Sequence, residues 1–237
     1  MAQAAGDGVA KARVDPLRPR VKSVASLLQA GTGGRTQRSA LSAYRSGAED
    51  KYYLGFDFGT SGARAKLIDD AGNVVIDKKC GYDSKHDRLD AQWERALDSL
   101  LEQMPESVLG RVSALAFDGT SATTMLIDRG TGEVLEQPKL YNEGQGLPAQ
   151  ERAKEMCPVG HAARASTSSL CKLLQWDFEG AWQRAESEGH VPGILHQADW
   201  LAAQFHGDWS CTDYTNSLKL GFDPGAEQYP QWLASQG

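Results

Sequence analysis

The sequence predicts an α/β fold in which a mixed sheet is flanked by helices, within a chain of 237 residues. Two groups of short apolar runs, at residues 52–82 and 112–141, have the length and composition of strands. A stretch with the spacing of an amphipathic helix separates the two groups, and two more helical stretches follow the second group. A mixed sheet combined with helices places the chain in the α/β class.

Each group of apolar runs predicts a meander of three adjacent antiparallel strands. The first group comprises YYLGFD (52–57), ARAKLID (63–69) and, after a turn at Gly72, NVVIDKKCGY (73–82). The second group comprises VSALAFD (112–118), TTMLID (123–128) and EVLEQPKLY (133–141). In both groups an aspartate and a turn of small residues follow the first strand, so the second group is expected to repeat the plan of the first.

Three helices are expected. The first lies between the two groups and ends before Pro105, because apolar residues recur there at three- and four-residue spacing: Leu89, Trp93, Ala96, Leu97, Leu100, Leu101 and Met104. The second is expected from about Ser168 to Glu186, and the third from near Asp199 to Gly207.

Charge and composition exclude several classes of protein. Residues 1–50 contain eight Lys or Arg and four Asp or Glu, whereas residues 51–237 contain 17 and 27. The acidic body makes a nucleic-acid partner improbable on charge grounds. No apolar stretch approaches the roughly 20 residues of a membrane helix, so no membrane partner is expected. The four cysteines are far apart and are read as reduced thiols, not as a zinc site or a disulfide framework: Cys80, Cys157, Cys171 and Cys211.

The first fifty residues differ from the rest of the chain. They are rich in Ala, Ser, Gly and Arg and lack the apolar core of a secretory signal. A composition rich in Arg and Ser and poor in acidic residues is typical of an organelle transit peptide, and the alternative is a disordered tail without targeting value. Residues 1–50 are therefore expected to be a disordered leader that targets a plastid, and the folded domain is expected at 51–237. If the leader is only a tail, the protein is cytoplasmic.

The turn in FDFGTSGAR (56–64) suggests a phosphate site. Its Gly-Thr-Ser-Gly segment has little side-chain bulk, so backbone N–H groups and two hydroxyls can approach an anion closely. Asp57, at the end of the preceding strand, offers hard oxygen ligands to Mg²⁺. The similar string FDGTSAT recurs at 117–123. For a single copy, the alternative reading is a tight hairpin in which the aspartate caps its own turn.

Five ordered motifs resemble the N-terminal domain of the FGGY carbohydrate kinases: YLGFDFGTSGARAKLIDDAGNVV, ALAFDGTSATTMLID, LYNEGQ, HQADWLAAQFHG and TDYTNSLKLGFDP. Within that family they look most like the plant and cyanobacterial xylulose-kinase-like proteins that act on D-ribulose. The resemblance covers about residues 52–236. It implies an actin-like, ribonuclease-H-like ATPase domain that transfers the γ-phosphoryl group of ATP to a sugar hydroxyl with Mg²⁺.

The resemblance also implies roles for particular residues. Asp57 matches the aspartate that lies beside the metal and the reacting phosphate. The loop at the phosphate and sugar end of the cleft is matched by Gly59, Thr60, Ser61, Gly62, Ala63 and Arg64. Sugar-facing positions are matched by Asp118, Gly119, Thr120, Ser121, Tyr141, Asn142 and Asp199. Arg64 is read equally well as a solvated strand residue, and the small residues of the second turn put the identity of the sugar in doubt.

Family members contain two such domains, and a general-base aspartate in a Gly-Gly-Asp-like motif lies downstream of every motif present here. The expected function is therefore phosphorylation of a pentulose, D-ribulose before D-xylulose, by a longer enzyme of which this chain is the N-terminal part. This chain alone is expected to be inactive. The alternative is a non-catalytic binding or interaction protein derived from a sugar kinase. The expected partners are ATP and the sugar, and the sequence leaves the oligomeric state open.

Overall fold

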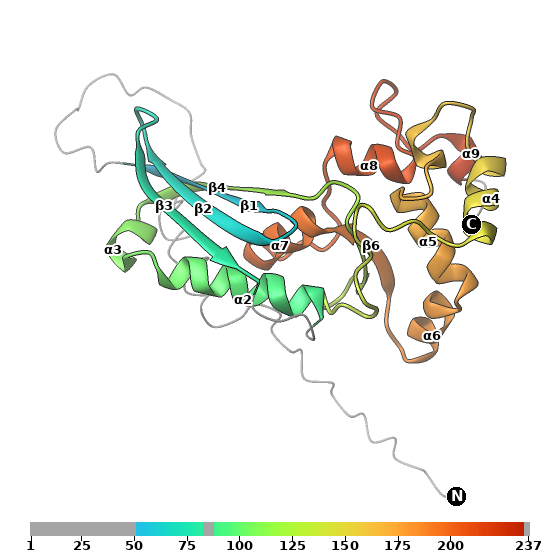
Figure 1. The fold of residues 1–237 in the computed structure, drawn as a ribbon, viewed down its shortest axis with the longest axis horizontal. Coiled ribbons are helices and arrows are strands. Elements are labelled where there is room, and N and C mark those ends of the chain that lie inside the picture. The colour runs from blue at the N-terminus through green and yellow to red at the C-terminus, as the bar shows by residue number, and fades with distance from the viewer. Residues whose placement is uncertain (1–50, 83–87, 235–237) are drawn as a thin grey trace, which may run out of the picture.

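The computed structural model describes residues 51–82 and 88–234. The expected leader at 1–50 lies outside the described residues, so the predicted domain boundary and targeting role stay predictions. The described part is elongated, with a four-stranded sheet and its helices at one end and a group of short helices at the other (Figure 1).

The four-stranded sheet contains the first predicted meander. Strands β1 (Tyr52–Phe58), β2 (Gly62–Asp69) and β3 (Val74–Gly81) pair antiparallel in that order, as expected. Strand β4 (Val112–Gly119) then lies parallel to β1 on its other side, which gives the order β3-β2-β1-β4. The parallel pairing requires a crossover, and helix α2 (Leu89–Glu102) supplies it where the sequence predicts a helix.

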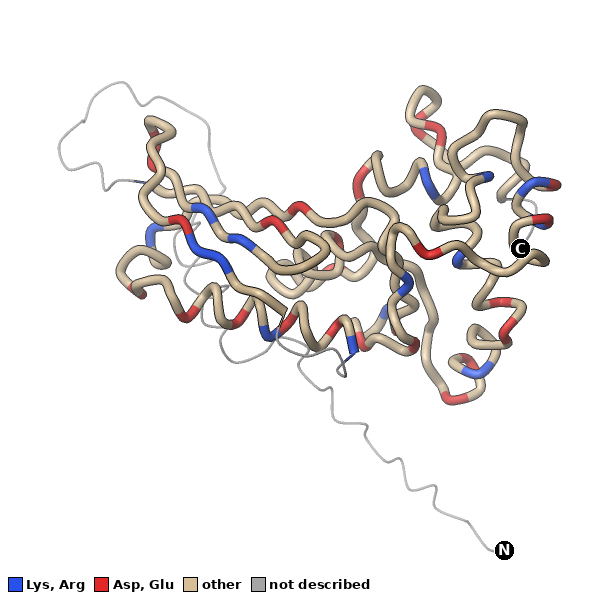
Figure 2. Tube along the Cα trace, in the orientation of Figure 1, with Lys and Arg blue, Asp and Glu red and all other residues tan. Residues whose placement is uncertain are grey.

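The two faces of this sheet differ because side chains alternate along each strand. Alternate residues of β1, including Leu54, Phe56 and Phe58, are buried in a core to which α2, packed on β2 and β3, and helix α7 (Gln197–His206), packed on β4, both contribute. Trp93 of α2 and Trp200 of α7 belong to this core. The opposite face is exposed and carries Arg64, Lys66, Asp77 and Lys79. Lys and Arg gather along β2 and β3 (Figure 2). The predicted site residues Asp57 of β1 and Asp118 of β4 are exposed on this face.

The second predicted meander is wrong in the pairing of its first two strands, and its last two runs meet only in part. Strand β5 (Thr124–Asp128) exists, but it pairs with β6 (Pro192–His196) in a separate two-stranded sheet and not with β4. Residues 133–141 meet β5 only at two isolated bridges, Thr124 with Lys139 and Ile127 with Val134. The chain leaves β4 through a bend that carries it toward the short helices, so the local pattern of three apolar runs does not close into a sheet.

The second predicted helix is divided. Helices α5 (Ser169–Phe178) and α6 (Ala181–Ser187) are separated by Gly180, whose φ of 68° is left-handed and ends a helical path. Helix α7 begins two residues before the predicted start and ends at the predicted Gly207, which has a φ of 76°. Both the C-terminal glycine and the approximate range were readable from the sequence.

Several short elements were not predicted: α3 (Glu106–Leu109), α4 (Leu147–Met156), the 3-10 turn η1 (Ala162–Arg164), α8 (Tyr214–Leu220) and α9 (Gln231–Ala234). Helices α4 and α5 and the η1 turn enclose a second apolar cluster that is distinct from the core under the sheet. Within the described ranges, no helix combines the length and the apolar character needed to cross a bilayer.

Candidate active site

The parallel pairing of β1 and β4 places the two turn aspartates side by side. Asp57 and Asp118 are register partners, and both side chains are exposed. Neighbouring strands lie about 4.8 Å apart, so the two carboxylates share one small region of the sheet. Both strands end toward the short helices (Figure 1). The two similar strings in the sequence are therefore adjacent in space, and they form the base of the candidate site.

The first turn is held tightly by its glycines. The Gly59 N–H donates to the Gly62 carbonyl at 3.0 Å, and the Tyr82 hydroxyl donates to the Gly59 carbonyl at 3.0 Å. A β-carbon on Gly62 would lie 2.6 Å from the Cys80 carbonyl oxygen. Burial raises the pKa of Tyr82 well above its ordinary range, and the nearby Asp57 carboxylate adds to this effect. Tyr82 therefore remains a neutral hydrogen-bond donor to the turn.

The remaining residues of the predicted phosphate loop divide between the two faces of β2. Thr60 and Ser61 are exposed at the tip of the turn, whereas the Ala63 side chain is buried in the core. Arg64 is exposed beside Asp57, its register partner on β1. It borders a hollow of about 360 Å³ on the open face of the sheet, lined also by Gly55, Phe56, Asp57, Lys66, Asp77 and Lys79.

The second turn is fixed by contacts with distant segments. Gln197 Oε1, at the start of α7, accepts from the Thr120 N–H at 2.9 Å and from the Thr120 hydroxyl at 3.0 Å. The Thr120 and Thr123 hydroxyls are 2.6 Å apart. A β-carbon on Gly119 would lie 2.8 Å from Gln197 Oε1, so a larger residue there would displace the Gln197 side chain that accepts from Thr120.

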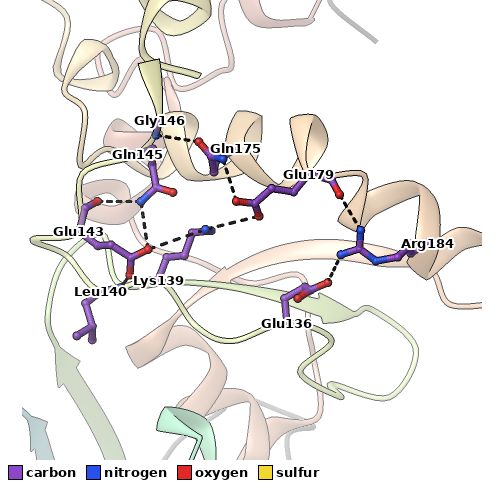
Figure 3. Close-up of polar contacts among 9 residues, drawn as sticks. All are labelled: Glu136, Lys139, Leu140, Glu143, Gln145, Gly146, Gln175, Glu179 and Arg184. Atoms are coloured by element: carbon purple, nitrogen blue, oxygen red, sulfur yellow. Dashed lines mark hydrogen bonds and ion pairs between the residues drawn. The ribbon is translucent and has the colours of Figure 1, made fainter. Parts of the chain in front are cut away.

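Tyr141 and Asn142 lie next to the second turn, as predicted. The Tyr141 N–H donates to the Thr123 hydroxyl at 3.1 Å, and both Tyr141 and Asn142 are exposed. Figure 3 shows how the segment that carries them is anchored: Lys139 lies between the carboxylates of Glu143 and Glu179, and the Gly146 N–H donates to Gln175. The segment thus connects the second turn to α5 and to the residues just after it.

Asp199 is placed behind the second turn, in a buried polar chain. Its Oδ2 accepts from the Thr212 hydroxyl at 2.7 Å and lies 3.1 Å from His196 Nδ1. His196 Nε2 is 2.7 Å from the Ser169 hydroxyl. This order of contacts resembles the triad of serine hydrolases, but Ser169 is 0% exposed and no acyl substrate can reach it. This series of hydrogen-bonded side chains therefore joins α5, β6 and α7. A role for Asp199 in sugar binding stays a prediction.

The residues present fit Mg²⁺ and a phosphate group. Within residues 51–82 and 88–234, no three His, Cys, Asp or Glu side chains form a cluster that could hold a metal ion alone. Mg²⁺ is commonly held by one or two carboxylates together with water and substrate phosphates, and the exposed Asp57 and Asp118 pair offers that donor set. All four cysteines are free thiols.

Three residues that support the turns were not predicted: Tyr82, Lys172 and Gln197. A single basic residue inside the apolar run Leu170–Trp176 is a sequence signal that could have singled out Lys172. Nothing in the sequence distinguishes Tyr82 or Gln197, because their roles depend on contacts across the fold.

Comparison with known proteins identifies the fold. A glycerol kinase of Enterococcus faecalis is 22% identical over 191 residues, which cover 73% of this chain and 37% of that protein. A structure of Plasmodium falciparum glycerol kinase with ADP has a TM-score of 0.61 at 15% identity, over 78% of this chain and 40% of that one. The xylulose kinase of Rhodospirillum rubrum has a TM-score of 0.60 at 17% identity, over the same shares.

These likenesses confirm the predicted fold class: a mixed sheet with flanking helices, as in the actin-like fold of sugar kinases. No protein-family model matches the chain. The chain spans about two fifths of the length of the kinases it matches.

Proposed function

We propose that this chain supplies the phosphate-binding and sugar-binding part of an ATP-dependent sugar kinase. The observation that carries the proposal is the parallel, in-register pairing of β1 and β4. That pairing sets Asp57 beside Asp118 and brings both small-residue turns to one end of the sheet. The likeness to glycerol and xylulose kinases, one of them solved with ADP, supports the same conclusion.

In this proposal each turn has a separate task. Asp57 would hold Mg²⁺, and the Gly59–Gly62 turn would bind the phosphate beside Arg64. A Mg²⁺ ion held by Asp57 would supply positive charge for the phosphate oxygens. Asp118 accepts hydrogen bonds from sugar hydroxyls, and the exposed Tyr141 and Asn142 border the same region. Catalysis of phosphoryl transfer consists almost entirely of substrate positioning and electrostatic stabilisation.

The proposed substrate is a pentulose, with D-ribulose preferred to D-xylulose. Support comes from the resemblance of the five motifs to plant and cyanobacterial proteins that act on D-ribulose. These two sugars differ at one stereocentre, so a hydrogen-bonding site that reads that hydroxyl can separate them.

Calorimetric titration of the full chain with D-ribulose, D-xylulose and glycerol, with and without Mg·ADP, tests the proposal. We expect D-ribulose to bind most tightly, Asp118→Asn to lose sugar binding, and Asp57→Asn to lose the Mg²⁺ dependence of ADP binding. Glu151→Gln, which changes an exposed carboxylate on α4, is the matched control. Absence of saturable sugar and nucleotide binding would favour a non-catalytic interaction protein.

A coupled ADP-release assay tests activity separately. We expect no measurable turnover from this chain with either pentulose, because it spans two fifths of the kinases it matches and transfer requires both substrates to be held. Turnover above background from a monodisperse sample would show instead that the chain is an enzyme in its own right.

We also propose that residues 1 to about 48 direct import into a plastid and are then removed. Their composition, rich in Arg and Ser, supports this role. A fusion of these residues to a fluorescent protein should enter the plastids of a plant or algal cell and be shortened. A diffuse cytosolic signal with an uncleaved leader would contradict the targeting role.

A further inference from the structure

A buried lysine lies directly behind the second turn. Lys172, in α5, is 0% exposed, and its ammonium Nζ donates a hydrogen bond to the carbonyl oxygen of Ala122. Among the described residues, no carboxylate lies within ion-pair distance of this ammonium. Burying a charge without an opposite charge is unfavourable, so a lysine in this position requires an explanation beyond packing.

The acceptor of this hydrogen bond is the most constrained residue of the turn. Ala122 has a φ of 67°, a left-handed conformation that is costly for a residue with a β-carbon and persists only where surrounding contacts fix it. Its N–H donates to Asn216 Oδ1 at 3.2 Å, and its carbonyl accepts from the Thr124 hydroxyl at 2.9 Å as well as from Lys172. Of these groups, Lys172 alone can carry a charge.

We propose that Lys172 is a positioning residue for the second turn. Through the Ala122 carbonyl it holds the backbone of the turn that follows Asp118 and contains Thr120. Hydrogen bonds from a charged donor are roughly twice as strong as neutral ones, which suits a contact that must hold a strained residue. The consequence for sugar binding rests on the proposed function, whereas the contact with Ala122 does not.

The contact is expected to respond to pH. The pKa of Lys172 is lowered to about 8, chiefly by burial, with Lys219 and Lys139 contributing to the shift and Glu143 and Cys171 opposing it. Loss of the proton changes the strength of the hydrogen bond to the Ala122 carbonyl. The carbonyl carbon should therefore report the titration of the lysine at accessible pH.

One resonance isolates this carbonyl, because Ala122–Thr123 is the only Ala-Thr pair in the sequence. Labelling the full chain with ¹³C-carbonyl alanine and ¹⁵N threonine gives a single peak in a carbonyl-to-amide correlation spectrum. In the wild type we expect this ¹³C shift to move with a midpoint near pH 8. It should stay flat in Lys172→Met and titrate normally in the control Lys154→Met, an exposed lysine on α4.

A shift that does not move in the wild type, or that moves equally in Lys172→Met, would overturn the proposal. The wild-type titration decides the contact even if Lys172→Met does not fold. The positioning role is decided by calorimetry with D-ribulose. Lys172→Met should weaken sugar binding about tenfold, the change expected from loss of a hydrogen bond to a charged group, and leave Mg·ADP binding unchanged.

Equal loss of sugar and nucleotide binding would identify Lys172 as a purely structural residue, and so would unchanged sugar binding. If the wild type binds no sugar, the proposed function fails, while the titration still shows whether Lys172 holds Ala122.

Discussion

Substitution of Gly62 by alanine should displace the first turn, and the fold provides a matched control. Gly62 and Gly81 are register partners on β2 and β3. A β-carbon on Gly62 would lie 2.6 Å from the Cys80 carbonyl oxygen and 3.2 Å from the Gly81 Cα, which are both backbone atoms. A β-carbon on Gly81 would meet nothing within 4 Å. The same chemical change is therefore crowded on one strand and unhindered on its neighbour.

The geometry sets the size of the effect. Relief of the 2.6 Å contact to an ordinary 3.4 Å requires β2 and β3 to separate locally by about 0.8 Å. A ladder hydrogen bond of about 2.9 Å lengthened by that amount is no longer a good hydrogen bond. Overpacking of this kind costs about 1–3 kcal/mol. In a domain of this size it corresponds to a fall in Tm of roughly 2–12 °C.

Urea unfolding followed by tryptophan fluorescence measures the stability term. Gly62→Ala should lose about 1–3 kcal/mol of unfolding free energy, and Gly81→Ala should be neutral or gain about 0.4–1 kcal/mol by restricting the unfolded chain. Mg·ADP titration should show weaker binding for Gly62→Ala alone, because the turn is displaced. Equal stabilities and equal ADP affinities for the two variants would refute the view that close backbone approach shapes this turn.

Three further predictions concern charge and reactivity. In a catalytically active version of the enzyme, Asp57→Asn should reduce Mg²⁺-dependent sugar phosphorylation by orders of magnitude with nearly unchanged folding, and wild-type turnover would refute the metal role. Cys211 is exposed and should react with a thiol reagent in the native state, whereas Cys157, buried with its pKa raised to about 11, should react only after unfolding. Between pH 8 and about 10, the unfolding free energy of the wild type should rise relative to that of Lys172→Met. The reason is that the folded-state pKa of Lys172 is lowered to about 8, chiefly by burial. In this pH range the unfolded chain therefore binds more protons than the folded protein, so stability increases with pH. Urea titrations at several pH values measure this difference, and unfolding free energies that change with pH equally in both proteins would contradict the linkage. The other groups that act on the pKa of Lys172 are present in both proteins: Glu143, Lys139, Lys219 and Cys171.

The sequence by itself determined the features that depend on near neighbours along the chain. The spacing of apolar residues predicted α2, and the three runs at 52–82 predicted the β1-β2-β3 meander, because short turns leave adjacent strands little choice of partner. The repeated Asp and small-residue turns indicated the candidate site, and Gly207 marked the end of α7. These patterns depend only on residues close together in the sequence, so they can be interpreted without the rest of the fold.

Only the tertiary structure decided which distant segments meet. The apolar runs after β4 predicted a second meander, but β5 pairs with β6, which lies much farther along the chain. Strand pairing between distant segments depends on which surfaces remain to be buried, and periodicity does not encode that choice. The same holds for Asp57 beside Asp118, and for Lys172 behind Ala122. Their residue types were visible in the sequence, but their partners were fixed by the crossover through α2 and by the burial of α5.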